Sequence, residues 1–564
     1  MQGAFVNQGN PNPALVRHTV YGPVRGADDS ASSGTHAWKG IPFAKPPVGE
    51  LRWCAPVEPD PWTEPRWATC FGPASAQYGL IHGPGLNNTY DDTIASSLGQ
   101  AVGNEDCLYL NIWRPATADR DLPVILFIHG GANLTGFTAD PVYDGAELAR
   151  SAHAVVVTAN FRLGVLGWFN LPQLKAGQDP LGDTGNYGTL DQIQVLRFIR
   201  DNIAEFGGNS GNVTVMGQSA GAMNVHALLT SPVVLEAKPQ LFHRAVLMSG
   251  ALALASELPP GSIPTLQPVA YSQAQGRALL NALVIADGFA ADDASADAWV
   301  AAQVPDFVAD YLRSKSPQEL FTQVLRKLLP VGLGIASLIP EGAVVANSPL
   351  TAIKAGAYLK VPLILSTTRD EAKLFQSFLA LSPLLGGLPG LIVSDATRLK
   401  LMRDFQPDAP QTLGVTDLIQ PAYLPVEAPG TGYEARMALL NHIFFVVNLE
   451  AMLQALTPQQ SDIWLYRFDW DEEPAPWDVV YGAAHLFDTP FVFGTFGPSV
   501  FSNAICSQAN EGGRLALSQA MMNALSAFAR TGDPNHEGLG LTWPIWPAKL
   551  IFDATRSEKI LSVI

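Results

Sequence analysis

The sequence is poor in basic residues. It holds 34 Lys and Arg against 51 Asp and Glu, which gives a formal net charge of −17 and a pI near 5.0. A surface of this sign repels phosphate backbones and anionic membrane surfaces. We therefore expect no nucleic-acid partner.

The sequence also lacks any uninterrupted run of 18 or more apolar residues, so we predict no membrane-spanning helix. The first residues, MQGAFVNQGNPNPALV, contain no basic segment followed by an apolar core and predict no signal peptide. Cysteine is scarce, with four residues, and neither a CxxC motif nor a Cys/His cluster is present. We therefore expect no metal site.

Apolar residues are abundant instead, at 47% of the chain, which is enough for a large core. Short apolar runs predict strands at 123–129, 154–159, 213–217, 244–249, 362–366 and 463–468. Helical patterns lie between them, as in 190–206, so the alternation predicts an α/β fold with a mostly parallel sheet flanked by helices. No polar linker divides the chain, and we expect one domain over 1–564, with helical cap insertions at about 251–345 and 375–460.

One short motif points to a specific chemistry. Gly217-Gln218-Ser219-Ala220-Gly221 fits the pattern G-x-S-x-G and lies directly between a predicted strand and a predicted helix. In that context the serine occupies a sharp turn that lifts its hydroxyl clear of the sheet. The next backbone N–H, that of Ala220, then points toward a developing oxyanion. The five-residue pattern alone also occurs by chance, so the flanking elements carry the interpretation.

Longer blocks extend this interpretation along the chain. In order they are KGIPFAKPPVGELRW (39–53), NEDCLYLNIWRP (104–115), ANFRLGVLGWF (159–169), GNYGTLDQ (185–192), GQSAGA (217–222), LFHRAVLMSG (241–250) and AFARTGDPN (527–535). Together they resemble the type-B carboxylesterase and cholinesterase family of α/β-hydrolases. The resemblance covers nearly the whole chain and is weakest in 251–360 and 375–460. It implies an α/β-hydrolase fold and a serine esterase.

A serine hydroxyl becomes a good nucleophile when a histidine takes its proton and a carboxylate orients that histidine. The block YGAAHLFDTPFVFGTF (481–496) resembles the histidine block of the family and implies that His485 is the base. The block LSTTRDEAKLF (365–375) resembles the acid block and implies that Glu371 is the acid, in the chain order Ser, acid, His. The alternatives are His243 and His442 for the base, and Asp370 and Asp488 for the acid.

The resemblance also places an oxyanion hole. The segment LFIHGGANLTGF (126–137) follows a predicted strand, where the family carries a run of glycines. Aligned with that run, Gly131 and Ala132 fall at the two loop N–H donors, which Ala220 completes, while Gly130 supports the turn. Asn133 stands in place of an aromatic residue, and we expect its amide to lie near the scissile ester.

Cys70 and Cys107 stand where the family closes its first disulfide loop, so the resemblance implies a Cys70–Cys107 bridge. A disulfide implies an oxidising compartment, and we expect a secreted or periplasmic protein whose signal peptide is absent from this numbering. The sequence leaves a cytoplasmic location open. Cys54 and Cys506 match no bridge position and are expected to be free.

The loop 71–106 contains no tryptophan. Cholinesterases use a tryptophan there to bind a quaternary ammonium through a cation–π contact, so its absence argues against choline esters. Arg52 and Glu105 match a buried ion pair of the family beside this loop. Several side chains near the predicted site are candidates for an apolar acyl or alcohol pocket: Leu134, Phe137, Met223, Leu486 and Phe487.

These features predict a serine carboxylic-ester hydrolase that acts on apolar or bulky small-molecule esters through an acyl-enzyme intermediate. Ser219, His485 and Glu371 would carry the reaction without a metal or organic cofactor. One alternative is an inactive cholinesterase-like binding or adhesion protein, although such proteins usually lack one of these three residues. The other is an amide or carbamate hydrolase with the same residues.

Overall fold

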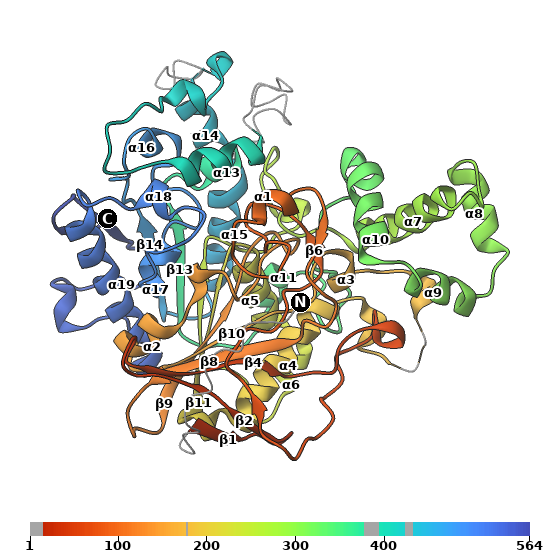
Figure 1. The fold of residues 1–564 in the computed structure, drawn as a ribbon, viewed down its shortest axis with the longest axis horizontal. Helices are drawn as coiled ribbons and strands as arrows, with labels where there is room; N and C mark the ends of the chain where they lie inside the picture. The colour runs from red at the N-terminus through yellow and green to blue at the C-terminus, as the bar shows by residue number, and fades with distance from the viewer. Residues whose placement is uncertain (1–14, 176, 178, 377–393, 424–431) are drawn as a thin grey trace, which may run out of the picture.

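A mixed sheet forms the centre of the computed structural model, which describes residues 15–564 except 176, 178, 377–393 and 424–431 (Figure 1). Its eleven strands lie in the order β16 (Lys559–Val563), β15 (Leu550–Ala554), β14 (Ile463–Phe468), β13 (Leu363–Thr368), β12 (Arg244–Met248), β11 (Gly208–Gln218), β9 (Leu122–Ile128), β10 (Val155–Ala159), β8 (Tyr109–Pro115), β4 (Thr35–Pro42) and β3 (Ala27–Asp29). Neighbours from β15 through β10 run parallel, and the pairs at both edges run antiparallel.

The parallel centre confirms the strands that the sequence predicted. Each of the six predicted runs falls within one of β9 to β14 or within one residue of its ends, and every residue of β9 and β10 is buried. The antiparallel strands toward the two ends of the sheet escaped prediction. In β8, Asn111 and Arg114 interrupt the apolar run, although both are buried and hydrogen-bonded, and β16 is mostly exposed.

Helices cover both faces of the sheet, and β9 shows how its two faces are divided. Val124 and Leu126 join the hydrophobic cluster that includes residues of α4 and α5, whereas Ile125 and Phe127 join the cluster that includes α2, α17 and α19. Successive side chains of a strand point to opposite faces, which explains this alternation. The helices are α2 (Ala146–Ala152), α4 (Tyr187–Asn202), α5 (Ala220–Thr230), α17 (Thr489–Phe493) and α19 (Glu511–Thr531).

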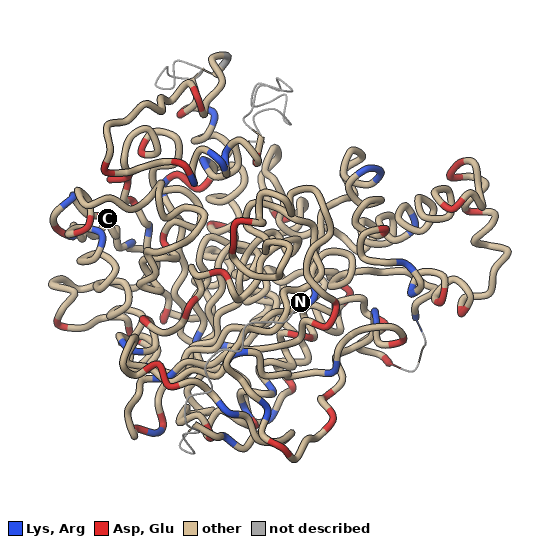
Figure 2. Tube along the Cα trace, in the orientation of Figure 1, with Lys and Arg blue, Asp and Glu red and all other residues tan. Residues whose placement is uncertain are grey.

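Between β12 and β13 the chain forms a helical arm that projects from the body at the right of Figure 1. It comprises α7 (Val269–Ala286), α8 (Asp293–Ala301), α9 (Pro305–Arg313) and α10 (Pro317–Gln323). The arm shares a hydrophobic cluster with Val165 and Leu166 of α3 (Gly164–Gly167). Figure 2 shows acidic residues along the arm and around the body, with Lys and Arg interspersed among them.

The connection between β13 and β14 is also helical where the structure describes it. It includes the 3-10 turn η10 (Glu371–Phe375), α13 (Asp395–Asp404), α14 (Tyr433–Asn441), the π-helix η14 (His442–Val446) and α15 (Val447–Leu456). Residues 377–393 and 424–431 of the predicted second insertion lie outside the described residues. The cap assignment of 251–345 and 375–460 stays a prediction.

One helical stretch, Tyr433–Leu456, is long and apolar enough to cross a membrane by length and composition alone. Half of its most apolar window is buried inside the protein. It also carries Phe445, whose ring packs on His485. The same stretch therefore has a packing role in the fold, as the core helices of many proteins do.

The predicted Cys70–Cys107 bridge is wrong, because both residues are free thiols in the structure. Cys107 is 1% exposed, whereas Cys70 is exposed to solvent. A disulfide requires two Cβ atoms that face each other about 4 Å apart, whereas the Cys70 thiol contacts Thr69 Oγ1. The expectation of a secreted or periplasmic location depended on this bridge and therefore loses its basis. By contrast, Arg52 and Glu105 form the expected ion pair, and both side chains are largely buried.

Candidate active site

Ser219 lies at the junction of β11 and α5, in the sharp turn that the motif predicted. Its backbone has φ 59° and ψ −126°, a conformation that residues other than glycine rarely adopt. Its N–H donates to the carbonyl of Met248 on the neighbouring strand β12, at 2.8 Å. The strained turn is therefore anchored to the parallel sheet.

Glycines surround this turn because backbone atoms approach it closely. A Cβ on Gly221 would lie 2.0 Å from the carbonyl oxygen of Ile128, and one on Gly250 would lie 2.3 Å from the carbonyl oxygen of Ser219. A Cβ on Gly130 would lie 2.8 Å from the Cβ of Ser219. Side chains at these positions would push the elbow, the strand end and the following loop apart.

Glu371 and His485 meet beside the elbow, although 114 positions separate them in the chain. The Glu371 carboxylate Oε2 bonds His485 Nδ1, and its Oε1 accepts a hydrogen bond of 2.7 Å from the Thr368 N–H. Glu371 is fully buried and His485 is 3% exposed. The rings of Phe375 and Phe445 each pack 5.1 Å from the imidazole, which keeps water away from this pair.

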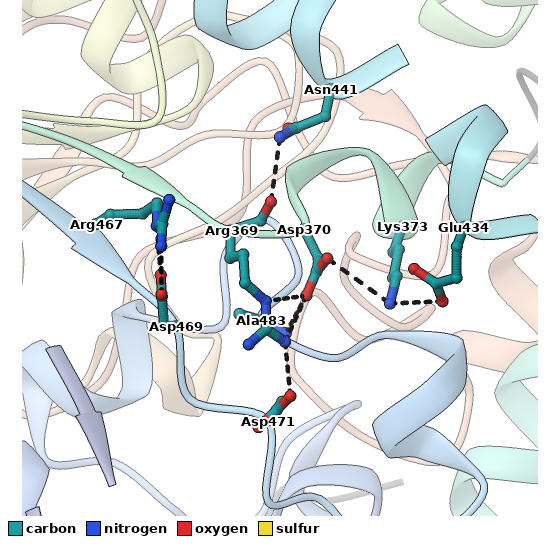
Figure 3. A network of polar contacts seen from close by, with 9 residues as sticks. All are labelled: Arg369, Asp370, Lys373, Glu434, Asn441, Arg467, Asp469, Asp471 and Ala483. Atoms are coloured by element: carbon teal, nitrogen blue, oxygen red, sulfur yellow. Dashed lines mark hydrogen bonds and ion pairs between the residues drawn. The ribbon is translucent and has the colours of Figure 1, made fainter. Parts of the chain in front are cut away.

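Asp370, the first alternative acid, belongs to a separate network of charges (Figure 3). Its Oδ2 accepts hydrogen bonds from the Arg369 guanidinium at 2.9 Å and from the Ala483 N–H at 3.2 Å. Lys373 lies 3.7 Å from its other oxygen and pairs with Glu434 of α14 at 3.0 Å. Asp370 thus joins the acid turn to the segment before His485 and leaves the imidazole to Glu371.

Arg369 extends this network to two further segments. Arg369 also binds the Asp471 carboxylate at 2.7 Å, and its backbone carbonyl accepts a hydrogen bond of 3.1 Å from Asn441 (Figure 3). Arg467 and Asp469 form a neighbouring pair at 2.5 Å. The two Arg369 contacts tie α14 and the segment after β14 to the acid turn.

Asp488, the second alternative acid, is fully buried close to the Glu371–His485 pair. Its Oδ2 accepts a hydrogen bond of 2.9 Å from the Tyr466 hydroxyl, and its Oδ1 has no partner within the described residues. Burial, followed by the negative charge of Glu371, raises the pKa of Asp488 to about 7. Below about pH 7 the Asp488 carboxyl is therefore protonated and neutral.

The other nitrogen of His485 has an unexpected neighbour. Its Nε2 lies 3.1 Å from the Nε2 of Gln218, the buried residue immediately before Ser219. The described residues include no hydrogen bond between the Ser219 hydroxyl and His485. The sequence predicts no role for Gln218, although its position next to the serine in the motif is a signal. His243, an alternative base, instead accepts a hydrogen bond from the Val213 N–H of β11.

The predicted oxyanion loop lies against the elbow. Gly131, Ala132 and Asn133 have φ values of 100°, 55° and 57° in succession. No acceptor within the described residues binds the backbone N–H groups of Gly131, Ala132 or Ala220, and Ala220 is only 2% exposed. Two of these unpaired N–H groups are on the loop and one is at the start of α5, and an oxyanion hole requires donors of this kind.

Asn133 differs from expectation. Its amide is 3% exposed and pairs with the amide of Asn224 on α5, so it does not face a substrate. Among the predicted pocket residues, Phe137 and Phe487 are also buried, at 1% and 0% exposed. Leu134, Met223 and Leu486 remain partly exposed near the elbow.

Comparison with known proteins gives the family. The sequence model of the carboxylesterase family matches residues 13–559. The chain belongs to the carboxylesterase family. It is 31% identical to para-nitrobenzyl esterase of Bacillus subtilis over 96% of this chain and 94% of that relative. It is 30% identical to fumonisin B1 esterase of Sphingopyxis macrogoltabida, over 94% of this chain and 85% of that relative.

Solved structures agree with this assignment. A para-nitrobenzyl esterase structure matches 98% of this chain and 97% of its own, with a TM-score of 0.71 and 28% identity. A Geobacillus stearothermophilus carboxylesterase matches 97% of this chain and 98% of its own, with a TM-score of 0.69 and 29% identity. The predicted α/β-hydrolase fold and the prediction of a type-B carboxylesterase are therefore confirmed, and the alternative of an inactive binding protein is not supported.

The buried Asp488 carboxyl makes the stability of this carboxylesterase depend on pH. The folded protein holds the Asp488 proton up to about pH 7, whereas an unfolded aspartate releases it near pH 4. This group's contribution to stability is therefore full below about pH 4 and falls as pH rises toward 7. Asp488→Asn removes that loss, so its melting temperature relative to wild type should rise from pH 5 to pH 8.

The measurement is thermal unfolding of both proteins across that pH range, with the exposed Asp121→Asn as the matched control. The difference in melting temperature between the control and wild type should not increase from pH 5 to pH 8. A difference between Asp488→Asn and wild type that stays constant with pH would contradict the assignment.

Proposed function

We propose that this carboxylesterase hydrolyses apolar carboxylic esters through a serine acyl-enzyme intermediate. The observation that carries the proposal is the buried Glu371–His485 pair beside a strained serine elbow with three unpaired N–H groups. A nucleophile, a base held by a carboxylate and converging donors are the parts that acyl transfer requires.

The proposed reaction begins when Ser219 Oγ attacks the ester carbonyl carbon and His485 Nε2 takes the hydroxyl proton. Glu371 holds Nδ1–H and stabilises the imidazolium that forms. The N–H groups of Gly131, Ala132 and Ala220 bind the oxyanion. The C–O bond to the alcohol then breaks, and the imidazolium gives its proton to the leaving alkoxide. Water, deprotonated by His485, repeats these steps and releases the carboxylic acid and free Ser219.

This sequence requires His485 to change partner. With Nδ1–H directed at Glu371, the neutral ring presents an unprotonated Nε2, which accepts a hydrogen bond from the Gln218 amide. The proposed attack needs the same Nε2 to accept from Ser219. Catalytic hydrogen bonds often tighten only when substrate binds, so a small ring movement from Gln218 to Ser219 fits the scheme.

The surroundings of the elbow support an apolar substrate. A small cavity includes Gly250, which packs against the Ser219 carbonyl. Its lining combines the apolar Met223, Ala251, Phe444, Phe445 and Leu449 with the polar Ser249, Thr265, Thr367 and Asn448. Ligand pockets typically combine apolar side chains with a few polar groups that orient the ligand. The relatives named for para-nitrobenzyl and fumonisin B1 esters also support bulky esters as substrates.

The first test replaces the nucleophile. Ser219→Ala should fold normally and lose about 10⁶-fold in turnover of p-nitrophenyl esters, because only the serine supplies the attacking oxygen. Turnover is measured with short, medium and long acyl chains, and intact mass is measured after treatment with an organophosphate. Wild type should gain one adduct at Ser219. A variant that keeps more than a hundredth of the rate would rule out this nucleophile. Anilide turnover as fast as ester turnover would favour the amidase alternative.

The second test separates the two adjacent carboxylates. Glu371→Gln should lower kcat by about 10⁴ because the amide favours the wrong histidine tautomer. Asp370→Asn is the matched control, since Asp370 binds Arg369 and Lys373 and not the imidazole. It should lower the melting temperature with a much smaller effect on kcat. The reverse ranking of the two variants would move the acid to Asp370.

The third test uses Gln218. In Gln218→Glu a carboxylate lies about 3 Å from His485 Nε2 and stabilises the protonated, inactive ring. The acidic limb of the kcat/KM profile should therefore move to higher pH by about one unit. Gln218→Met keeps the shape without charge and serves as the control. Identical acidic limbs in both variants would contradict a working contact between Gln218 and His485.

A further inference from the structure

Two buried amides connect the oxyanion loop to the helix that follows the nucleophile. Asn224 Nδ2 donates to Asn133 Oδ1 at 3.0 Å, and Asn133 Nδ2 donates to Asn224 Oδ1 at 3.4 Å. The two residues are 3% and 0% exposed and lie 91 positions apart in the chain. A reciprocal amide pair of this kind fixes both distance and orientation.

On the loop side, the pair holds a segment whose backbone conformation is strained. Gly131, Ala132 and Asn133 form an unbroken run of positive φ values, which L-residues rarely adopt. Beyond Asn133 the buried Gln77 side chain fixes the loop, because its Oε1 accepts hydrogen bonds from Thr135 Oγ1 and the Gly136 N–H, both at 2.9 Å. Asn133 is thus the residue next to the donors at which a side chain reaches across to α5.

The helix side of the pair carries the third donor. Asn224 follows Ala220 by four positions in α5, so the two residues lie one turn apart on the same side of the helix. Ala220 occupies the first helical position, where its N–H has no helical acceptor. Any shift of α5 relative to the loop would move the Ala220 N–H away from those of Gly131 and Ala132.

We propose that the Asn133–Asn224 pair is a clamp that sets the spacing between the two halves of the oxyanion hole. Both asparagines are positioning residues, because their side chains bind each other and not the substrate. The inference rests on the proposed function, since a fixed spacing matters when three N–H groups must meet one oxyanion. Donors held in place before the reaction stabilise the transition state without reorganising.

The test is a double-mutant cycle with Asn133→Ala, Asn224→Ala and the double variant, assayed on a p-nitrophenyl ester. Each single variant should lose about 10- to 100-fold in kcat with KM changed less than twofold, because full loss of one donor costs about 10² to 10³. The double variant should lose no more than the larger single loss, since either change opens the same clamp.

A second readout is the inhibition constant of an aryl trifluoromethyl ketone, which forms a tetrahedral adduct. It should rise by the same factor as kcat/KM falls. The matched control is Asn510→Ala, because Asn510 is also fully buried and donates to two carbonyls, those of Glu472 and Ile505. It should lower the melting temperature and leave kcat and the inhibition constant unchanged.

Three outcomes overturn the clamp. They are unchanged kcat and inhibition constants in stable single variants, losses that multiply in the double variant, and a rise in KM with kcat retained. If Asn224→Ala does not fold, Asn224→Ser supplies the same readouts with a shorter polar side chain. The organophosphate adduct at Ser219 of wild type distinguishes failure of the proposed function from failure of the clamp. If the adduct does not form, the proposed function is wrong. If it forms, the kinetics of the variants decide whether the clamp exists.

Discussion

The positive φ of Ser219 is the constraint on which the rest of the site depends. It is maintained by backbone atoms, because Gly221 lies against the Ile128 carbonyl and Gly250 against the carbonyl of Ser219. The parallel register of β11 with β9 and β12 brings these atoms together. The hydroxyl, the start of α5 and the following loop are therefore placed by the sheet itself, and side chains then adjust their alignment.

The central strands could be predicted because of where they lie. Strands covered on both faces have continuous apolar runs, and β9, β10 and β12 carry that pattern from end to end or nearly so. The antiparallel strands toward the ends of the sheet interrupt their apolar residues with polar ones, such as the buried Asn111 in β8, whose amide binds Thr138 and Thr158. A hydropathy pattern records such a residue as polar, and it does not reveal the hydrogen bonds that allow the residue to be buried.

The site was predictable where its parts are local motifs and less so where its parts meet only in the fold. The serine turn, the acid turn and the histidine segment each have a recognisable local sequence, whereas the partners of Gln218 and Asn133 lie 267 and 91 positions away. The ion network of Asp370 joins four separate segments and could not be read from any one of them. The disulfide prediction failed because a matched position says nothing about the direction of a side chain: Cys107 is buried in the core and Cys70 is exposed.

The two phenylalanines around His485 have a consequence for engineering. Phe445 packs on the imidazole and also lines the small cavity that includes Gly250, next to the Ser219 backbone. One side chain therefore affects both the width of the cavity and the exclusion of water from the His485 imidazole. A substitution at that position changes both properties together. A smaller side chain at this position would admit larger acyl groups and would also admit water to the His485 imidazole. A wider substrate range and a slower turnover would then result from the same substitution.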